Sequence, residues 1–327
     1  MTKSHTIIAL SLISLAGCSH LSVVDYCDLG KKQYSEGQYQ ESANSYTEAI
    51  KRDSMLATAY YNRGNDYRNL KNYQAALFDF TKAIKLKPHQ ADVYADRAFI
   101  YINLNDFKSA IKDLSKAIDL NPYYVSAYDF RGSAYKSLKN YKASLQDYSK
   151  AIQLKPDYAR AYQNRGIVYH ILKDTAAAMK DYNKAIELDS SYGRAYYNRG
   201  NLYHESGNIN AAIQDYVKSV ELEPGYPPGY NNLGFVYFEM DSVQLAKPFF
   251  LKCIEINESQ WDASLGLALC YFRLNDLPNA KKYLAMAIQV EPRLEAGMSG
   301  IEKIEAEHHK FSQNARTSME GLFQAIK

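Results

Sequence analysis

The sequence predicts an all-α fold assembled from a repeated unit. The triplet Asn-Arg-Gly occurs at 62–64, returns 102 residues later at 164–166, and returns again 34 residues later at 198–200. Steps of 34 residues from position 23 divide the chain into eight units that end at residue 294 without an insertion. A fixed period of this length is typical of repeat proteins, in which each unit stacks on its neighbours.

Four columns of the repeat predict how the helices pack. The eighth position is always Gly or Ala and the twentieth is always Ala or Ser, so helix backbones can approach closely there. The eleventh is Tyr in seven units and the twenty-fourth is Tyr, Phe or Leu, which fill gaps between helices. Proline closes five units at position 32, where it cannot continue a helix. The periodic aromatic residues therefore indicate a core, with no cofactor.

The period and these columns resemble the tetratricopeptide repeat, a helix-turn-helix unit of 34 residues. The resemblance implies a right-handed superhelix, an αα-solenoid of about eight repeats, followed by C-terminal capping helices. The predicted repeats are 23–56, 57–90, 91–124, 125–158, 159–192, 193–226, 227–260 and 261–294.

Residues 295–327 are expected to form a capping helix and a final amphipathic helix. Met319, Leu322, Phe323 and Ile326 have the spacing of one helical face. That face must be buried against the chain's own groove, a second copy in a homodimer, or a partner.

The first eighteen residues have the organisation of an export signal, with Lys3, an apolar run and small residues. Leu15-Ala16-Gly17-Cys18 resembles the lipobox of bacterial lipoproteins. The resemblance implies cleavage of the signal peptide 1–17, lipidation of Cys18 with acyl chains such as palmitate, and a short tether at 18–22. Ser19 implies the outer membrane, with the protein facing the periplasm. The alternative is an ordinary secretory signal with a cysteine nearby.

Composition argues against several classes of function. The 39 basic and 36 acidic residues leave a net charge of only +3, so we expect no nucleic-acid partner. The four cysteines have no zinc-site spacing, and no catalytic motif occurs, which predicts neither a metal site nor an enzyme. Cys253 and Cys270 are expected to be buried, and a disulfide between them stays open.

Two columns change together along the chain. Position seven is Arg in the second to sixth repeats, and position twenty-three is Asp in the same five repeats. Both positions are uncharged in the first, seventh and eighth repeats, so contact between them is the simplest explanation. The alternative is a ladder of arginines that grips an acidic ligand. The predicted structural ion pairs are Arg63 with Asp79, Arg97 with Asp113, Arg131 with Asp147, Arg165 with Asp181, and Arg199 with Asp215.

Asparagine at position six is the candidate for function. The family resemblance implies that this part of the first helix lines a concave groove, where asparagines bind the backbone of an extended peptide. A carboxamide both donates and accepts hydrogen bonds, which suits that role. The alternative is a solvated polar face. The position-six candidates are Asn62, Asn164, Asn198 and Asn232.

Neighbouring positions are expected to face the same groove, which turns from polar to apolar toward the C-terminus. A shared metal between His170 and His204 is disfavoured, because they lie on successive repeats. A C-terminal helix that covers the phenylalanines remains an alternative. The further groove candidates are Tyr61, Tyr197, Arg160, Arg194, His170, His204, Phe235 and Phe238.

These observations predict a non-catalytic scaffold in the bacterial cell envelope. It would hold peptide segments of partner proteins and bring, for example, a periplasmic protease or peptidoglycan hydrolase to its target. The alternative is a pilotin-like factor for assembly of an outer-membrane secretin or barrel.

Overall fold

The computed structural model describes residues 21–307 and 311–326. The predicted signal peptide 1–17 and the predicted lipidation site Cys18 lie outside these residues. The chain divides into two compact units, 1–156 and 157–327, and each is considered by itself.

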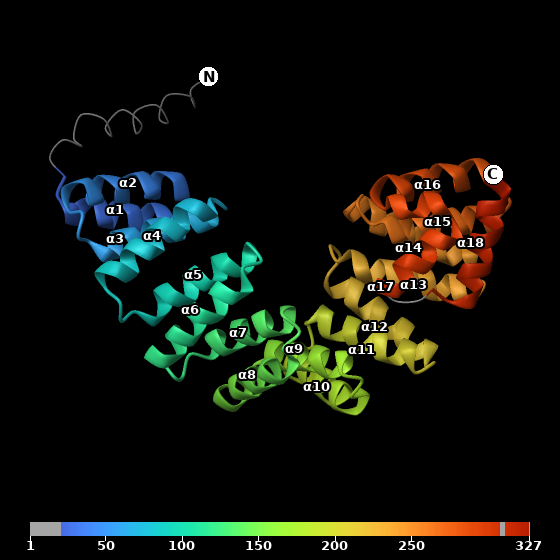
Figure 1. Ribbon diagram of the computed structural model, residues 1–327, viewed down its shortest axis with the longest axis horizontal. Helices are drawn as coiled ribbons and strands as arrows, with labels where there is room; N and C mark the ends of the chain where they lie inside the picture. Colours follow the sequence, from blue (N-terminus) through green and yellow to red (C-terminus); the bar gives the residue numbers. More distant parts are fainter. Residues whose placement is uncertain (1–20, 308–310, 327) are drawn as a thin grey trace, which may run out of the picture. The chain divides into compact units, whose positions relative to one another are not determined.

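Both units consist of antiparallel helix pairs joined by short turns (Figure 1). The first unit contains α1 Val23–Ser35, α2 Tyr39–Arg52, α3 Ala57–Asn69, α4 Tyr73–Leu86, α5 Ala91–Asn103, α6 Phe107–Leu120, α7 Val125–Ser137 and α8 Tyr141–Leu154. The second contains α9 Ala159–Ile171, α10 Thr175–Leu188, α11 Gly193–Glu205, α12 Ile209–Leu222, α13 Pro227–Glu239, α14 Val243–Ile256, α15 Trp261–Arg273, α16 Leu277–Val290, the 3₁₀ turn η2 Pro292–Ala296, α17 Met298–Glu307 and α18 Gln313–Ile326.

The odd-numbered helices from α1 to α15 begin at the first residue of each predicted repeat. The residue at position 15 has a positive φ in all eight repeats, from 57° at Lys71 to 78° at Gly207. This left-handed residue ends the first helix and reverses the chain. In six of the eight repeats, Asn or Asp at position 16 then caps the second helix, as Asn140 does by accepting a hydrogen bond from the backbone N–H of Ala143.

Glycine at position eight makes room for the aromatic ring at position twenty-four. A Cβ atom on Gly166 would lie 2.6 Å from Cε1 of Tyr182, closer than two carbons can approach. In the third repeat, where position twenty-four is Leu114, position eight is Ala98. The small residues that the sequence shows at position eight therefore mark a close crossing of the two helices. The residue is glycine where the side chain at position twenty-four is an aromatic ring and alanine where it is leucine.

The five Arg–Asp pairs that covariation predicts are all present, with two hydrogen bonds each. In the third repeat, Nε and Nη2 of Arg97 donate to Asp113 at 2.7 and 2.8 Å. The Arg97 guanidinium also lies 5.9 and 6.0 Å from the ring centroids of Tyr94 and Tyr101. The ion pair and the two rings together join the helices of one repeat. The equivalent pairs are Arg63 with Asp79, Arg131 with Asp147, Arg165 with Asp181, and Arg199 with Asp215.

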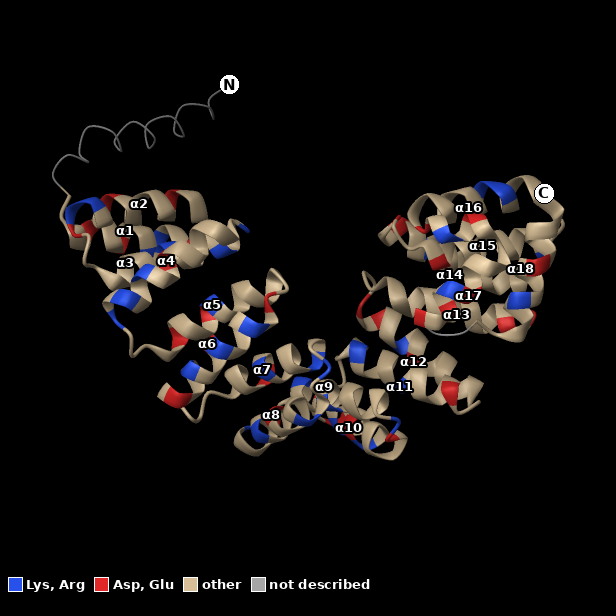
Figure 2. Ribbon diagram, viewed as in Figure 1, with Lys and Arg blue, Asp and Glu red and all other residues tan. Residues whose placement is uncertain are grey.

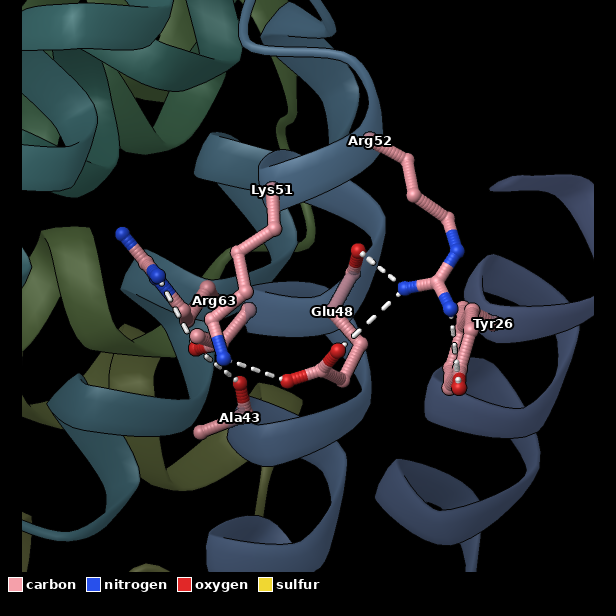
Figure 3. Close-up of polar contacts among 7 residues, drawn as sticks. Tyr26, Ala43, Glu48, Lys51, Arg52 and Arg63 are labelled. Atoms are coloured by element: carbon pink, nitrogen blue, oxygen red, sulfur yellow. Dashed lines mark hydrogen bonds and ion pairs between the residues drawn. The ribbon is translucent and has the colours of Figure 1, made fainter. Parts of the chain in front are cut away.

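Each of these arginines also contacts side chains other than its aspartate. Nη1 of Arg63 donates to Oγ1 of Thr47 in the preceding repeat at 2.9 Å, and Thr47 donates to the carbonyl of Ala43. Close by, Glu48 binds Lys51 and Arg52, and Arg52 lies over the ring of Tyr26 (Figure 3). Such contacts link α1, α2 and α3. Elsewhere, residues of both signs are scattered over the helices (Figure 2).

The seventh and eighth repeats are apolar where the second to sixth are charged. Leu233 and Leu267 replace the arginine, and the aromatic residue at position twenty-three stacks on the tyrosine at position eleven. The ring centroids of Tyr237 and Phe249 are 5.5 Å apart with parallel planes. The same stacking joins Tyr271 and Tyr283. Aromatic stacking therefore occupies the place of the ion pair.

The final helix α18 closes this end by packing on α13, α15 and α17. Met319, Leu322 and Phe323 are at most 7% exposed, and Ile326 packs against the same core cluster. The amphipathic face that the sequence predicts is thus buried against the chain itself, which was one of the three alternatives. Cys253 and Cys270 are separate, buried thiols, and burial raises the pKa of each to about 12.

Within residues 21–307 and 311–326, no helix combines the length and apolar character needed to span a membrane.

One carboxyl group in the first unit is buried without a charged partner. Asp66 on α3 is 0% exposed, and its Oδ2 lies 2.9 Å from the hydroxyl of Ser42, which also lies 2.9 Å from the carbonyl of Gly30. Asp66 Oδ1 has no hydrogen-bond partner within the described chain. Burial raises the pKa of Asp66 to about 7, well above its usual 3.8.

The substitution Asp66→Asn should therefore remove a pH dependence of stability. Because the folded-state pKa is raised, the contribution of the neutral acid is complete below about pH 4 and is lost as pH rises through about 7. Relative to Asp66→Asn, the wild type should lose at most about 4 kcal/mol of unfolding free energy over this range. Urea denaturation at several pH values measures it. The exposed N-cap variant Asp106→Asn is the control, and an equal pH profile for wild type and Asp66→Asn would refute the assignment.

Candidate functional site

The second unit contains a cavity of about 650 Å³, lined mainly by the first helix of each repeat. Helices α11, α13 and α15 form most of its floor, and Ile304 of α17, Phe311 and Ser312 also line it. The lining residues are His170, Tyr197, Asn201, His204, Glu205, Tyr216, Pro228, Asn231, Asn232, Phe235, Val236, Glu239, Gln260, Trp261, Asp262, Ile304, Phe311 and Ser312.

The centre of the floor is a hydrogen-bonded network of neutral groups. Nδ2 of Asn232 donates to Oδ1 of Asn201 at 2.9 Å and lies 3.4 Å from the hydroxyls of Tyr197 and Tyr216. The hydroxyl of Tyr216 donates to the same Oδ1 at 2.8 Å. Burial raises the pKa of both tyrosines, so their phenols stay protonated at neutral pH. These hydrogen bonds hold the Asn232 side chain in one orientation in the floor of the cavity.

Two histidines bridge successive repeats at one edge of the cavity. Nε2 of His170 lies 2.9 Å from Oε1 of Glu205, and Nε2 of His204 lies 2.9 Å from Oε2 of Glu239. Each histidine thus has its own carboxylate on the next repeat. Nowhere in the described part of the chain do three His, Cys, Asp or Glu side chains gather as a metal site would require.

The cavity lining also contains a cluster of aromatic rings. The ring of Phe311 lies 5.8 Å from that of Phe235 and 6.4 Å from that of Trp261, measured between centroids. Phe235 also packs edge-on against the buried ring of Phe250. A lining that combines polar groups with aromatic side chains is typical of ligand-binding cavities.

At the end of the cavity nearest Trp261, a buried amide meets a carboxylate. Nδ2 of Asn231 donates to Oδ2 of Asp262 at 2.9 Å, and the backbone N–H of Ala263 lies 3.0 Å from the other carboxylate oxygen. Burial raises the pKa of Asp262. Asn231 and Asp262 thus add an amide oxygen and a carboxylate, both hydrogen-bond acceptors, to the lining of the cavity.

The structure brings together only part of the predicted groove. The cavity gathers His170, Tyr197, His204, Asn232 and Phe235. The other predicted residues of the second unit, Asn164, Asn198, Arg160 and Arg194, are not among its lining side chains.

The predicted groove residues Asn62 and Tyr61 belong to the first unit and are not among the residues that line this cavity. There, the hydroxyl of Tyr61 donates to Asp96 at 2.8 Å.

The assignment of Phe238 to an open groove is wrong. Its side chain is 0% exposed and belongs to the C-terminal core cluster. Nδ2 of Asn314, on α18, donates to the carbonyl of Phe238 at 3.2 Å, and the guanidinium of Arg273 lies over the ring. Helix α18 therefore covers the position that is open in earlier repeats, as the alternative interpretation held.

Sequence reasoning missed the residues that distinguish this cavity, namely Asn231, Glu239, Trp261, Asp262 and Phe311. Two departures from the repeat pattern mark them. Position one is a small residue or proline in seven repeats but Trp261 in the eighth, and position 34, Tyr in four preceding repeats, is Gln260. Phe311 lies beyond the last repeat, so periodicity gives no signal for it.

Family comparisons cover most of the chain. Models described as TPR repeat match residues 30–67, 132–173, 168–207 and 200–241, and models described as tetratricopeptide repeat match 57–90, 91–124, 227–260 and 262–293. The chain belongs to the tetratricopeptide repeat family. Among curated proteins, none matches the sequence significantly.

Solved structures show the same fold. A tetratricopeptide repeat protein from Parabacteroides merdae ATCC 43184 is 18% identical, with a TM-score of 0.64, over 81% of this chain and 98% of that one. MamA from Desulfovibrio magneticus RS-1 is 22% identical, with a TM-score of 0.50, over 52% of this chain and 96% of that one. These likenesses show the tetratricopeptide fold.

The His204–Glu239 pair predicts a pH dependence within the cavity. The hydrogen bond that the protonated ring donates to the Glu239 carboxylate raises the pKa of His204 above its usual 6.5. The stabilisation is therefore complete below about pH 6.5 and is lost as pH rises through the folded-state pKa. Glu239→Gln should lower the pKa of His204 in an NMR titration and destabilise the protein more at about pH 6 than at about pH 9. An unchanged His204 pKa would contradict the pairing, and Glu221→Gln on the exposed face of α12 is the control.

Proposed function

We propose that this tetratricopeptide repeat protein is a non-catalytic scaffold that holds peptide segments of partner proteins in the cavity of its second unit. The observation that carries the proposal is that the Asn232 network and the rings of Phe235, Trp261 and Phe311 line one cavity. Protein interaction is the general role of this fold. On this chain, the cavity is the place where binding would occur.

The chemistry of the wall suits a peptide. The carboxamides of Asn232 and Asn201 present donors and acceptors to backbone groups whatever the sequence of the ligand. The rings of Trp261, Phe311 and Phe235 offer apolar surface to side chains. A cavity of about 650 Å³ is large enough for a few residues, in the usual range for ligand sites.

The cell envelope is the proposed place of action. The lipobox-like Leu15-Ala16-Gly17-Cys18 supports export and lipid attachment to the outer membrane. Because α1 begins at Val23, only a few residues separate Cys18 from the first repeat. The adaptor would therefore act on partners close to the membrane, such as a periplasmic protease or a peptidoglycan hydrolase.

The same short tether favours a second function, that of a pilotin-like factor that escorts an outer-membrane secretin or barrel. Deletion of the protein separates the two. An adaptor's loss should stabilise substrates or alter cell-wall hydrolysis, whereas a pilotin's loss should leave outer-membrane multimers missing.

Peptide binding can be measured through Trp261, the single tryptophan of the chain. Peptides selected on the full chain from a displayed random library should change its fluorescence. Asn232→Ala should weaken their binding by about tenfold or more, because it removes hydrogen-bond partners from the wall. Asn62→Ala, at the same repeat position in the first unit, is the matched control. Selected peptides that leave Trp261 unperturbed, or that bind both variants equally, would place the binding site elsewhere.

A further inference from the structure

The cavity contains a buried hydrogen-bond acceptor that the chain leaves unused. Asn231 on α13 is 8% exposed and lines the cavity. Because its Nδ2 must donate to the carboxylate of Asp262, the orientation of the amide is fixed. Its Oδ1 then has no hydrogen-bond partner within the described residues. A buried acceptor of this kind is costly unless a ligand supplies the donor.

Comparison with an earlier repeat shows how this acceptor lost its partner. Gln163 has the same position in the fifth repeat, and its Oε1 accepts a hydrogen bond from the hydroxyl of Tyr192 at 3.2 Å. Tyr192 is the last residue of that repeat. The seventh repeat ends with Gln260 in place of the tyrosine. The substitution removes the phenol that would satisfy the amide oxygen, and both Asn231 and Gln260 line the cavity.

Among the described residues, the carboxylate beside this acceptor has no positively charged neighbour in the lining. The described lining presents three carboxylates, of Glu205, Glu239 and Asp262, and no Lys or Arg side chain. Glu205 and Glu239 each contact a histidine. Asp262 accepts hydrogen bonds from the neutral donors Asn231 Nδ2 and the backbone N–H of Ala263. A carboxylate removed from water is stabilised strongly when a cation reaches it.

The aromatic rings next to Asp262 complete a surface that attracts cations. Trp261 precedes Asp262 in the chain and lies edge-on to Phe311. Tryptophan has the aromatic face that interacts most favourably with ammonium and guanidinium groups. In the other seven repeats, the position of Trp261 is Val, Ala, Gly or Pro, so the large ring belongs to this place alone among the repeats.

We propose that Asp262, Asn231 and Trp261 form a subsite for a positively charged group of the bound peptide, a lysine or arginine side chain or a free amino terminus. Asp262 neutralises the charge, Asn231 Oδ1 accepts an N–H, and the indole ring covers the alkyl part. The inference rests on the proposed function and names the chemistry of the segment that the cavity selects.

The experiment compares matched peptides on matched variants of the full chain. Each library-selected peptide is synthesised with its basic residue intact and with an uncharged analogue, norleucine for lysine or citrulline for arginine. An acetylated form tests the amino terminus. Affinity is read from Trp261 fluorescence for the wild type, Asp262→Asn and Asn231→Leu.

For the wild type, loss of the peptide's charge should weaken binding by about tenfold or more. For Asp262→Asn, the charged and uncharged peptides should bind about equally, because the partner of the charge is gone. Asn231→Leu should weaken binding of the charged peptide by a smaller factor.

Asp92→Asn is the control for Asp262→Asn. Asp92 has the same position in the first turn of α5, so its substitution removes the same helix-terminal charge away from the cavity. Its affinities should match those of the wild type.

The outcomes separate this inference from the proposed function. Peptides that perturb Trp261 but bind equally well with and without their charge would overturn the cation subsite and leave peptide binding intact. Equal loss of affinity for charged and uncharged peptides on Asp262→Asn would also overturn it, since the carboxylate would then serve structure only. If no selected peptide perturbs Trp261, both proposals fail.

Discussion

The paired hydrogen bonds between arginine at position seven and aspartate at position twenty-three are the interaction on which the helix pairs of the second to sixth repeats depend. In the third repeat, the Asp113 side chain is only 5% exposed and that of Arg97 only 15%. An ionised carboxylate so removed from water is strongly destabilising without its partner. Because the guanidinium is planar and contacts both oxygens, the pair fixes the separation and the rotation of the two helices together.

The same pair explains the abundance of tyrosine. In each charged repeat the guanidinium contacts the tyrosine at position four, and in four of the five it also contacts the tyrosine at position eleven, as Arg199 contacts Tyr196 and Tyr203. The rings shield the ion pair from water and attract the cation with their faces. Where the pair ends, after the sixth repeat, the position-eleven tyrosine stacks on an aromatic residue instead, as Tyr237 does on Phe249. The interior of the last two repeats is therefore more apolar than that of the second to sixth repeats. Helix α18 packs against these last two repeats.

The cavity lies where these two kinds of repeat meet. Asn201 and His204 come from the last repeat with an ion pair, and Trp261 comes from the last repeat of the array. The combination of polar groups and aromatic rings in the lining follows from this junction. The departures at Gln260 and Trp261 then give the site its own chemistry, which a uniform array would lack.

Periodicity predicted the parts of the structure that repeat and failed at the parts that do not. The Arg–Asp pairs and the close crossing at Gly166 could be predicted because eight copies of one geometry expose correlated changes within a single sequence. Phe238 could not be placed correctly, because α18, which covers it, has no counterpart in the repeats. Equivalence of position likewise grouped Asn198 with Asn232, although the lining of the cavity includes only Asn232. What faces a ligand depends on tertiary contacts beyond the period.

A double-mutant cycle on Arg97 and Asp113 tests the central role of the ion pair most directly. The single variants Arg97→Leu and Asp113→Phe each leave one buried charge unpaired, and each should cost about 3 kcal/mol of unfolding free energy in urea. The double variant copies the seventh repeat, where Leu233 and Phe249 stand in these positions, and the introduced phenyl ring would stack on Tyr101 as Phe249 does on Tyr237. It should therefore be more stable than either single variant. A double variant that loses the sum of the two single losses would contradict the account.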